Sequence, residues 1–314
     1  MINNASTDNS LEVIRSYGER VRIVELTANF GFAGGYNSGL EHVDADVFIL
    51  LNSDIEVTPE WTEPLIGAMH ADKTIGAVVP KIKAHLKKSY FEYAGAAGGY
   101  LDKFGYAFCR GRIFDEIEVD QGQYDTKREV AWGSGCALVV RATLFQGLGG
   151  FDHSFFAHYE EIDLCWRIRQ AGYRIYALPE STVYHLGGGT MGYASPRKMH
   201  LNFRNSLFML YKNLDGWARF KVILARLVLD GVASGVFLLE GKINFIGAVL
   251  KAHLVFYKSM GMLSKRKKME RKLIKDNAIA PPNKNGHFSG SIIYRYFIKK
   301  QKTFSALNYE EKEN

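Results

Sequence analysis

Short runs of apolar residues recur along the first 185 residues of the chain, and each has the length of a β-strand. The runs are RIVEL at 22–26, DVFILL at 46–51, GAVVPKI at 76–82, ALVVR at 137–141 and RIYALPESTVYH at 174–185. Segments that fit helices separate the first three runs, whereas residues 84–130, rich in Gly, Tyr and charge, predict a loop-rich excursion. The alternation of strand and helix predicts an α/β domain with a mainly parallel central sheet, whose ligands bind at the carboxyl ends of the strands.

The segment HYEEIDLCWRIRQAGYRI at 158–175 predicts an amphipathic helix that ends near Gly172. Its first turn holds three carboxylates, Glu160, Glu161 and Asp163. Acids at this end of a helix gain roughly 0.3–1 kcal/mol each from the helix dipole. Helix capping is therefore one explanation of the three acids, and a catalytic role is the other.

The last third of the chain has a different pattern and the opposite charge. Residues 197–314 carry 23 Lys and Arg against 8 Asp and Glu, whereas residues 1–196 carry 17 against 25. Long aliphatic stretches with spaced cations, followed by KRKKMERKLIK at 265–275, predict amphipathic helices on an anionic membrane surface. Two alternatives stay open: a helical subdomain with a solvated basic face, and nucleic-acid binding, which the absence of any nucleic-acid-binding motif disfavours. We expect a domain over 1–213 and a basic amphipathic region over 214–314.

Composition narrows the class of protein. A chain of 314 residues with 47% hydrophobic content can bury one large core and carry an appendage. The three cysteines, Cys109, Cys136 and Cys165, fit neither a CxxC motif nor a zinc-binding spacing, which predicts reduced thiols in a cytoplasmic protein. No signal peptide opens the sequence, and the apolar stretch at 231–239 lies between two acids, so we expect no membrane-spanning helix. The expected location is peripheral, at the inner face of the cell membrane, and a homodimer is compatible with the sequence.

Candidate chemistry follows the predicted strands. NSD at 52–54 places Asp54 just past a strand end, where a hard cation could bridge a carboxylate and a diphosphate. The same tripeptide is also ordinary turn chemistry. The glycine-rich segment at 29–40 could let backbone approach a nucleotide, although it matches neither the dinucleotide-binding nor the Walker pattern. His185 ends a strand and could reach the same metal, but a lone histidine is more often structural.

Six segments of the chain occur in a distinctive order. They are NNASTD, NFGFAGGYNSG, LLNSD, GSGCALVVR, GGFDHSFFAHYEEIDLCWRIRQAGY and VYHLGGGT. In this order, from Ile2 to Asn213, the chain resembles the family 2 glycosyltransferases, and among them the rhamnosyltransferase-like branch that assembles bacterial surface polysaccharides. The resemblance implies a GT-A, Rossmann-like fold, a nucleotide-diphosphate sugar (dTDP-rhamnose or a UDP-sugar) as donor, and Mg²⁺ or Mn²⁺ as cofactor. It also implies transfer with inversion to a glycan or a lipid-linked glycan.

The resemblance also implies roles for individual residues. An inverting transfer needs one carboxylate to accept the proton of the acceptor hydroxyl, and the family's motif puts Glu161 at this position. The implied metal ligands are Asp54 and His185. The implied nucleotide-sugar contacts are Asn3, Asn29, Gly31, Gly35, Asn37, Asn52, Ser53 and Asp54. The implied acceptor contacts are Glu160, Asp163, Gly150, Asp152 and Trp132.

The chain departs from the family pattern in three respects. Glu161 stands where the family has Asp, Asn3 replaces the first nucleotide-binding Asp, and the family's opening strand, turn and helix would precede Met1. That strand would lie in the middle of the sheet, beside the strand that ends at NSD. We therefore weigh two functions: an active inverting transferase, and a non-catalytic relative that binds glycan, nucleotide or a partner enzyme. A sugar-phosphate nucleotidyltransferase is disfavoured, because the basic glycine-rich loop that it should carry near its start is absent.

Overall fold

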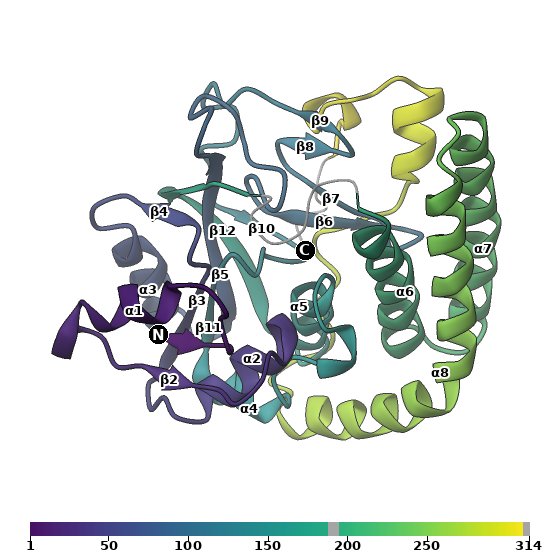
Figure 1. The fold of residues 1–314 in the computed structure, drawn as a ribbon. Coiled ribbons are helices and arrows are strands. Elements are labelled where there is room, and N and C mark those ends of the chain that lie inside the picture. Colours follow the sequence, from purple (N-terminus) through teal and green to yellow (C-terminus); the bar gives the residue numbers. More distant parts are fainter. Residues whose placement is uncertain (188–194, 310–314) are drawn as a thin grey trace.

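The structure, a computed structural model, describes residues 1–187 and 195–309. Figure 1 shows a central β-sheet with helices on its faces and a group of long helices along one side of the molecule. The last three residues of the GGGT segment at 187–190 lie outside the described residues.

The central sheet has six strands in the described residues, in the order β10-β12-β5-β11-β3, with β4 pairing to β12. Its strands are β3 (Val47–Leu51), β4 (Ile55–Val57), β5 (Ile75–Ala84), β10 (Arg128–Glu129), β11 (Ala137–Arg141) and β12 (Arg174–His185). Four of them coincide closely with the predicted apolar runs. Side chains alternate across β11, because Val139 packs against one side of the sheet while Leu138 and Val140 pack against the other.

The sheet is mixed, so the prediction of a mainly parallel sheet is wrong. Strand β11 runs antiparallel to both of its neighbours, β3 and β5, and only the pairing of β5 with β12 is parallel. The reason lies in the connection between β5 and β11. A parallel neighbour needs a crossover that returns the chain to its starting edge, usually a helix. Residues 85–136 supply short strands and loops instead, and the chain re-enters the sheet at the same end at which β5 leaves it.

Helices cover both faces of the sheet. On one face lies α3 (Thr62–Ala71), whose Leu65 and Met69 pack with Val78 of β5. The other face is covered by α4 (Ala142–Gly147) and α5 (Glu160–Gln170), as well as by α2 (Gly31–Leu40). The predicted end of α5 is confirmed, because the helix stops at Gln170 and Gly172 takes a left-handed φ of +85°. All three cysteines are free thiols, as expected.

Two smaller sheets complete the strands of the described residues. Strands β1 (Ile2–Asn3) and β2 (Val24–Glu25) form a parallel pair, with α1 (Ser10–Arg15) between them along the chain. The excursion forms an antiparallel meander whose strands are β6 (Gly99–Asp102), β7 (Ala107–Cys109), β8 (Arg112–Ile113) and β9 (Glu116–Ile117). Strand β13 (His287–Phe288) pairs with β6, so the chain returns to this sheet after its helical region.

Three long helices form the helical side of the molecule: α6 (Pro196–Asn213), α7 (Gly216–Leu239) and α8 (Ile243–Asp276). The hydroxyl of Ser195 caps α6 by accepting from the backbone N–H of Lys198, and Pro196 occupies the first helical position. Figure 1 shows α7 and α8 as a hairpin at the edge of the molecule, with α6 between that hairpin and the sheet. Helices dominate the region 214–314 as far as Asp276, where α8 ends. The residues that follow pack on the core, among them Phe288 and Phe304.

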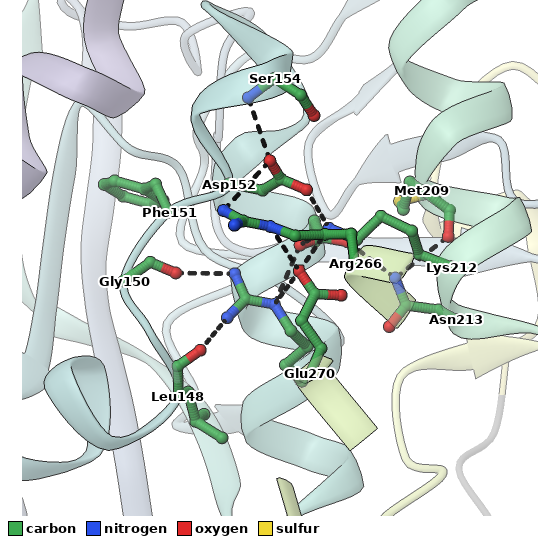
Figure 2. Close-up of polar contacts among 12 residues, drawn as sticks. Leu148, Gly150, Phe151, Asp152, Ser154, Met209, Lys212, Asn213, Arg266 and Glu270 are labelled. Carbon is green, nitrogen blue, oxygen red and sulfur yellow. Dashed lines mark hydrogen bonds and ion pairs between the residues drawn. The ribbon is translucent and has the colours of Figure 1, made fainter. Parts of the chain in front are cut away.

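A buried group of ion pairs joins this helical side to the sheet domain (Figure 2). The Nζ atom of Lys212 lies 2.7 Å from a carboxylate oxygen of Asp152, 3.0 Å from one of Asp163 and 2.8 Å from one of Glu270. Two further cations complete what we call the Lys212 cluster: Arg167, which binds Asp163 at 2.9 Å, and Arg266, which lies 3.3 Å from Asp152. Three cations therefore neutralise three carboxylates.

Electrostatics inside the cluster follow from this pairing. Burial opposes ionisation of Asp152, yet the charges of Lys212 and Arg266 hold its pKa below the usual value. Burial, together with the charge of Asp163, raises the pKa of Glu270. The cluster is stable only as a set, because a buried ion left without its partner keeps its desolvation cost and loses its compensation.

We expect Lys212→Met to lower the free energy of unfolding by about 3–5 kcal/mol, because it leaves three buried carboxylates facing two cations. Urea titration followed by circular dichroism measures the change. Lys265→Met, an exposed position on α8, is the matched control and should alter stability by no more than about 0.5 kcal/mol. Equal losses in the two variants would contradict the structural role of the cluster.

Candidate active site

A cavity of about 980 Å³ lies between β1, the start of α2 and the carboxyl end of β3. The polar part of its wall includes Asn4, Gly31, Gly35, Asn52, Ser53 and Asp54. All of these except Asn4 were expected to contact the nucleotide sugar, and Asn4 follows Asn3, which was also expected to do so. The apolar flank of the cavity is formed by β3, which is the outer strand of the central sheet and leaves Ile49 38% exposed.

Two glycines let α2 begin at the wall of this cavity. Gly31 has a φ of +70°, and a Cβ atom there would lie 2.6 Å from the ring of Phe156. A Cβ atom on Gly35 would lie 2.8 Å from the amide nitrogen of Asn4. That amide donates to the carbonyl of Gly31 at 2.9 Å, so the glycines allow Asn4 to hold the helix start against the cavity.

Three other residues expected to contact the nucleotide do not line this cavity and instead hold loops. The side-chain oxygen of Asn3 accepts from the N–H of Ser6 at 3.1 Å, and that of Asn29 accepts from Gly31 at 2.9 Å. The amide of Asn37 exchanges two hydrogen bonds with the backbone of residue 151. Contacts of these three side chains with a nucleotide stay predictions.

The expected metal ligands lie next to each other. His185, the last residue of β12, places its Nε2 atom 3.3 Å from Oδ2 of Asp54. Its Nδ1 atom lies 3.3 Å from Oε1 of Glu92, a buried carboxylate. The imidazole is thus held between two acids, and one ring nitrogen is directed to each.

The pairing sets the protonation of this group. Burial alone would lower the pKa of His185, but hydrogen bonds to Asp54 and Glu92 and their negative charges raise it to about 9. The hydrogen bond from His185 is the main cause that lowers the pKa of Asp54. Without a bound cation, the imidazole is therefore protonated and bridges the two carboxylates.

Glu92 was not identified from the sequence. It lies in the segment interpreted as a loop-rich excursion, and no motif surrounds it. Only the pairing of β5 with β12 in the folded chain brings residues near 84 to the end of β12, as the register of His185 with Ala84 shows.

The carboxylate pair Glu160 and Glu161 opens α5 after a strained turn. Three residues of this turn have left-handed φ values without being glycine: Phe156 (66°), His158 (69°) and Tyr159 (73°). Such conformations cost of order 1–3 kcal/mol each and persist only where the surroundings enforce them. Asn205 of α6 does so here, because its amide nitrogen lies 2.7–3.0 Å from the carbonyl oxygens of residues 155, 157 and 158.

Burial gives the two glutamates unusual acidities. It raises the pKa of Glu161 to about 7. Burial and the charge of Glu161 raise the pKa of Glu160 well above its ordinary value. A carboxyl with a pKa near 7 exchanges its proton readily at neutral pH, so Glu161 suits the role of a general base.

The thiol of Cys136 marks where the acidic groups converge. Burial is the largest cause that raises its pKa, and the negative charges of Glu92, Asp54 and Glu161 add to the effect. All three carboxylates are therefore close enough to act on this thiol, and the Cβ atom of Glu161 lies 3.6 Å from where a Cβ atom on Gly135 would be. The backbone carbonyl of Cys136 also accepts from the N–H of Asn52, which ties the NSD turn to the same place.

The remaining residues expected to contact the acceptor lie inside the protein. Asp163 is fully buried and Asp152 is 1% exposed, and both belong to the Lys212 cluster. The indole of Trp132 is 3% exposed and donates to the carbonyl of Tyr100 at 3.0 Å. Gly150 accepts from Arg167 through its carbonyl at 2.8 Å. Their observed contacts are structural, and contact with an acceptor stays a prediction for all four.

Comparison with known proteins gives a family and distant relatives. The sequence model described as Glycosyl transferase family 2 matches residues 1–116. An N-acetylglucosaminyl-diphospho-decaprenol L-rhamnosyltransferase of Mycobacterium tuberculosis is 24% identical in an alignment 234 residues long, which covers 70% of this chain and 76% of that protein. The low-salt glycan biosynthesis hexosyltransferase Agl10 of Haloferax volcanii is 21% identical in an alignment 239 residues long, which covers 73% of each chain.

Among solved structures, the mannosyltransferase PcManGT of Pyrobaculum calidifontis, in complex with GDP-Man and Mn²⁺, is similar at 15% identity and a TM-score of 0.46, covering 87% of this chain and 75% of that one. GalNAc-T7 with UDP, GalNAc and Mn²⁺ is similar at 18% identity and a TM-score of 0.49, and the match covers 66% of this chain and 40% of that one. The family match includes Asp54 and Glu92, whereas Glu161 and His185 follow it in the chain. The chain contains a glycosyl transferase family 2 domain and is distantly related to a bacterial rhamnosyltransferase.

Proposed function

We propose that this glycosyltransferase moves a sugar from a nucleotide-diphosphate sugar to a hydroxyl of a glycan or lipid-linked glycan, with inversion at the anomeric carbon. The observation that carries the proposal is the contact of His185 with Asp54, which lines a cavity large enough for a nucleotide, together with the position of Glu161 beside Gly135, just before β11. Rhamnose is the first candidate for the sugar, because the relative from M. tuberculosis is named a rhamnosyltransferase.

Two acidic sites, one with Asp54 and His185 and the other with Glu160 and Glu161, fit a direct displacement at the anomeric carbon. The acceptor oxygen forms its bond to the anomeric carbon while its proton passes to the carboxylate of Glu161. The bond from that carbon to the diphosphate oxygen breaks, and the diphosphate leaves with the electron pair. One base and no covalent nucleophile are needed. The raised pKa of Glu160 disfavours a second negative charge beside the base.

The residues present fit a divalent cation. Oδ2 of Asp54 and Nε2 of His185 are close enough to bind one ion, and Glu92 is placed to accept from Nδ1 and fix the tautomer that exposes Nε2. One or two protein ligands suffice when phosphate oxygens and water complete the shell of Mg²⁺ or Mn²⁺. When bound, such an ion would neutralise the charge of the leaving diphosphate.

Glu161→Gln should reduce the turnover number by roughly 10²–10⁴ while donor affinity stays nearly constant, because the amide keeps the shape of the base but accepts no proton. Turnover is measured with dTDP-rhamnose and UDP-sugars as donors, and affinity by calorimetry. Glu160→Gln is the control, since burial and the charge of Glu161 already disfavour a negative charge on Glu160, and it should change turnover only a few-fold. An inactive Glu160→Gln with an active Glu161→Gln would make Glu160 the base. Donor binding without any turnover in the unaltered protein would favour the non-catalytic alternative.

The rate of transfer should rise with pH around a midpoint near 7, because the base acts only after Glu161 loses its proton, and its pKa is raised to about 7. The profile of kcat/KM against pH for the acceptor measures this midpoint. A profile that is flat between about pH 5 and pH 9 would show that the group with the raised pKa is not the base.

Asp54→Ala should abolish Mn²⁺-dependent nucleotide binding, and His185→Ala should weaken it. Glu92→Gln should weaken it by about 10–100-fold, because the imidazole loses its orienting partner. Calorimetric titration of UDP and dTDP with and without Mn²⁺ measures the effect. Glu56→Gln, a partly exposed acid two residues from Asp54 along the chain, is the control and should keep full affinity. Unchanged affinity in both Asp54→Ala and His185→Ala would remove the metal from the proposal.

A further inference from the structure

Helix α7 turns a continuous apolar face to the outside of the protein. All its exposed residues from Leu224 to Leu239 are uncharged: Leu224, Val228, Gly231, Val232, Gly235, Val236, Leu238 and Leu239. Val228 and Val232 are 62% and 61% exposed. Since the spacing of three and four residues places these side chains on one side of a helix, they form a stripe about 24 Å long.

The charged side chains in the same stretch of α7 face the interior of the protein. Arg226 is buried, donates to the hydroxyl of Ser206 at 2.8 Å and lies 3.9 Å from the centre of the Tyr106 ring. Asp230 is fully buried and lies 3.0 Å from Nε2 of His253. Both charges are paired with the protein beneath the helix, so neither reduces the apolar character of the outer face.

Helix α8 extends this face and borders it with cations. Ile243, Leu250 and Leu254 are each 60% exposed, and Tyr257 is 49% exposed. Exposed lysines recur along the helix at intervals of seven residues, and we call them the lysine line: Lys251, Lys258, Lys265 and Lys272. The acid within this span, Glu270, is buried in the Lys212 cluster. The exposed side of α8 up to Lys275 therefore presents apolar and basic groups without an acid.

The start of α7 carries the residue types that favour a membrane interface. Trp217 is 66% exposed and stacks on Phe220 at 4.9 Å, with Lys221 above its ring. Tryptophan beside lysine is typical of the headgroup level of a bilayer, where a ring is half immersed and an ammonium meets phosphate.

We propose that the α7–α8 face, defined by the exposed apolar residues of α7 from Trp217 to Leu239 and of α8 from Ile243 to Tyr257, docks in the headgroup and acyl boundary of an anionic lipid bilayer. The helix axes lie in the plane of the membrane, and the lysine line of α8 contacts anionic headgroups. A second copy of the chain is a less suitable occupant, because self-association would bring lysine-bordered surfaces of the same charge together.

In-plane docking, not spanning, follows from the contacts of α7. Its length and its mean hydropathy of 2.1 over the best 18 residues would suffice to cross a membrane, although the sequence predicted no membrane-spanning helix. Arg226 and Asp230, however, bind the middle of the helix to α6, α8 and residues 104–106. Spanning would expose this buried pair to hydrocarbon and detach the helix from the domain. Docking along the surface leaves every one of these contacts in place.

Vesicle binding tests the proposal with the full chain. We expect co-sedimentation with vesicles of phosphatidylcholine and phosphatidylglycerol at low salt, and much weaker binding to phosphatidylcholine alone. Binding should fall as salt rises, since the screening length shortens from about 30 Å at 0.01 M to about 3 Å at 1 M. The fluorescence of Trp217 should shift to the blue on binding, and Trp217→Phe identifies the signal among the four tryptophans.

Val228→Asp and Val232→Asp should each lower the vesicle partition coefficient about tenfold or more, because a charge replaces a side chain that leaves water. Val13→Asp on α1, where the valine is 50% exposed, is the matched control and should bind as the unaltered protein does. Circular dichroism and nucleotide binding in solution should be unchanged in all three, which separates this proposal from the proposed function. Absent vesicle binding at low salt, or binding that neither face variant alters, would overturn the proposal. So would a lipid-independent dimer that Val232→Asp dissociates, since a second copy would then occupy the face.

Discussion

The rest of the structure depends on one interaction: the buried ammonium group of Lys212 forms ion pairs with three carboxylates. Its partners come from three parts of the chain: the turn that holds Asp152, helix α5 through Asp163, and helix α8 through Glu270. Each buried ion would be costly alone, and the set is tolerable because every charge has an opposite within about hydrogen-bond distance. Helices α6 and α8 are thereby part of the transferase core, although their sequence has the charge of a separate basic region.

The cluster also fixes the frame in which the chemistry occurs. Arg167 bonds Asp163 and the carbonyls of Leu148 and Gly150, which sets the turn that precedes α5. Asn37 binds the backbone of the next residue in that turn, and so connects α2, at the wall of the cavity, to the same frame. The start of α5, where Glu160 and Glu161 lie, is therefore held both by contacts of its own helix and by contacts from the wall of the cavity.

Local features of this fold were predictable, and features that depend on distant contacts were not. The ranges of β11 and β12 and the end of α5 follow from apolar runs and Gly172, and the proximity of Asp54 and His185 follows from two strand ends. The direction of β11 depends on residues 85–136, which form short strands and loops and no crossover helix. The spacing of apolar residues in the sequence does not reveal this. Glu92 reaches His185 only through strand pairing. Asp152 and Asp163 look like available acids in the sequence, because the lysine that neutralises them lies at least 49 residues away.

Helix α6 connects the two surfaces on which transfer to a lipid-linked acceptor would depend. Asn205 and Lys212 are seven residues apart, so they lie on the same side of α6 and face the sheet domain. One holds the strained turn before Glu160, and the other holds α5 and α8. The adjacent residue, Ser206, accepts from Arg226 and so connects α6 to the α7–α8 hairpin. A bilayer docked on the outer face of the hairpin would therefore be separated from the base by the hairpin and α6. The orientation of the protein on the membrane and the orientation of Glu161 would then be set by the same buried contacts.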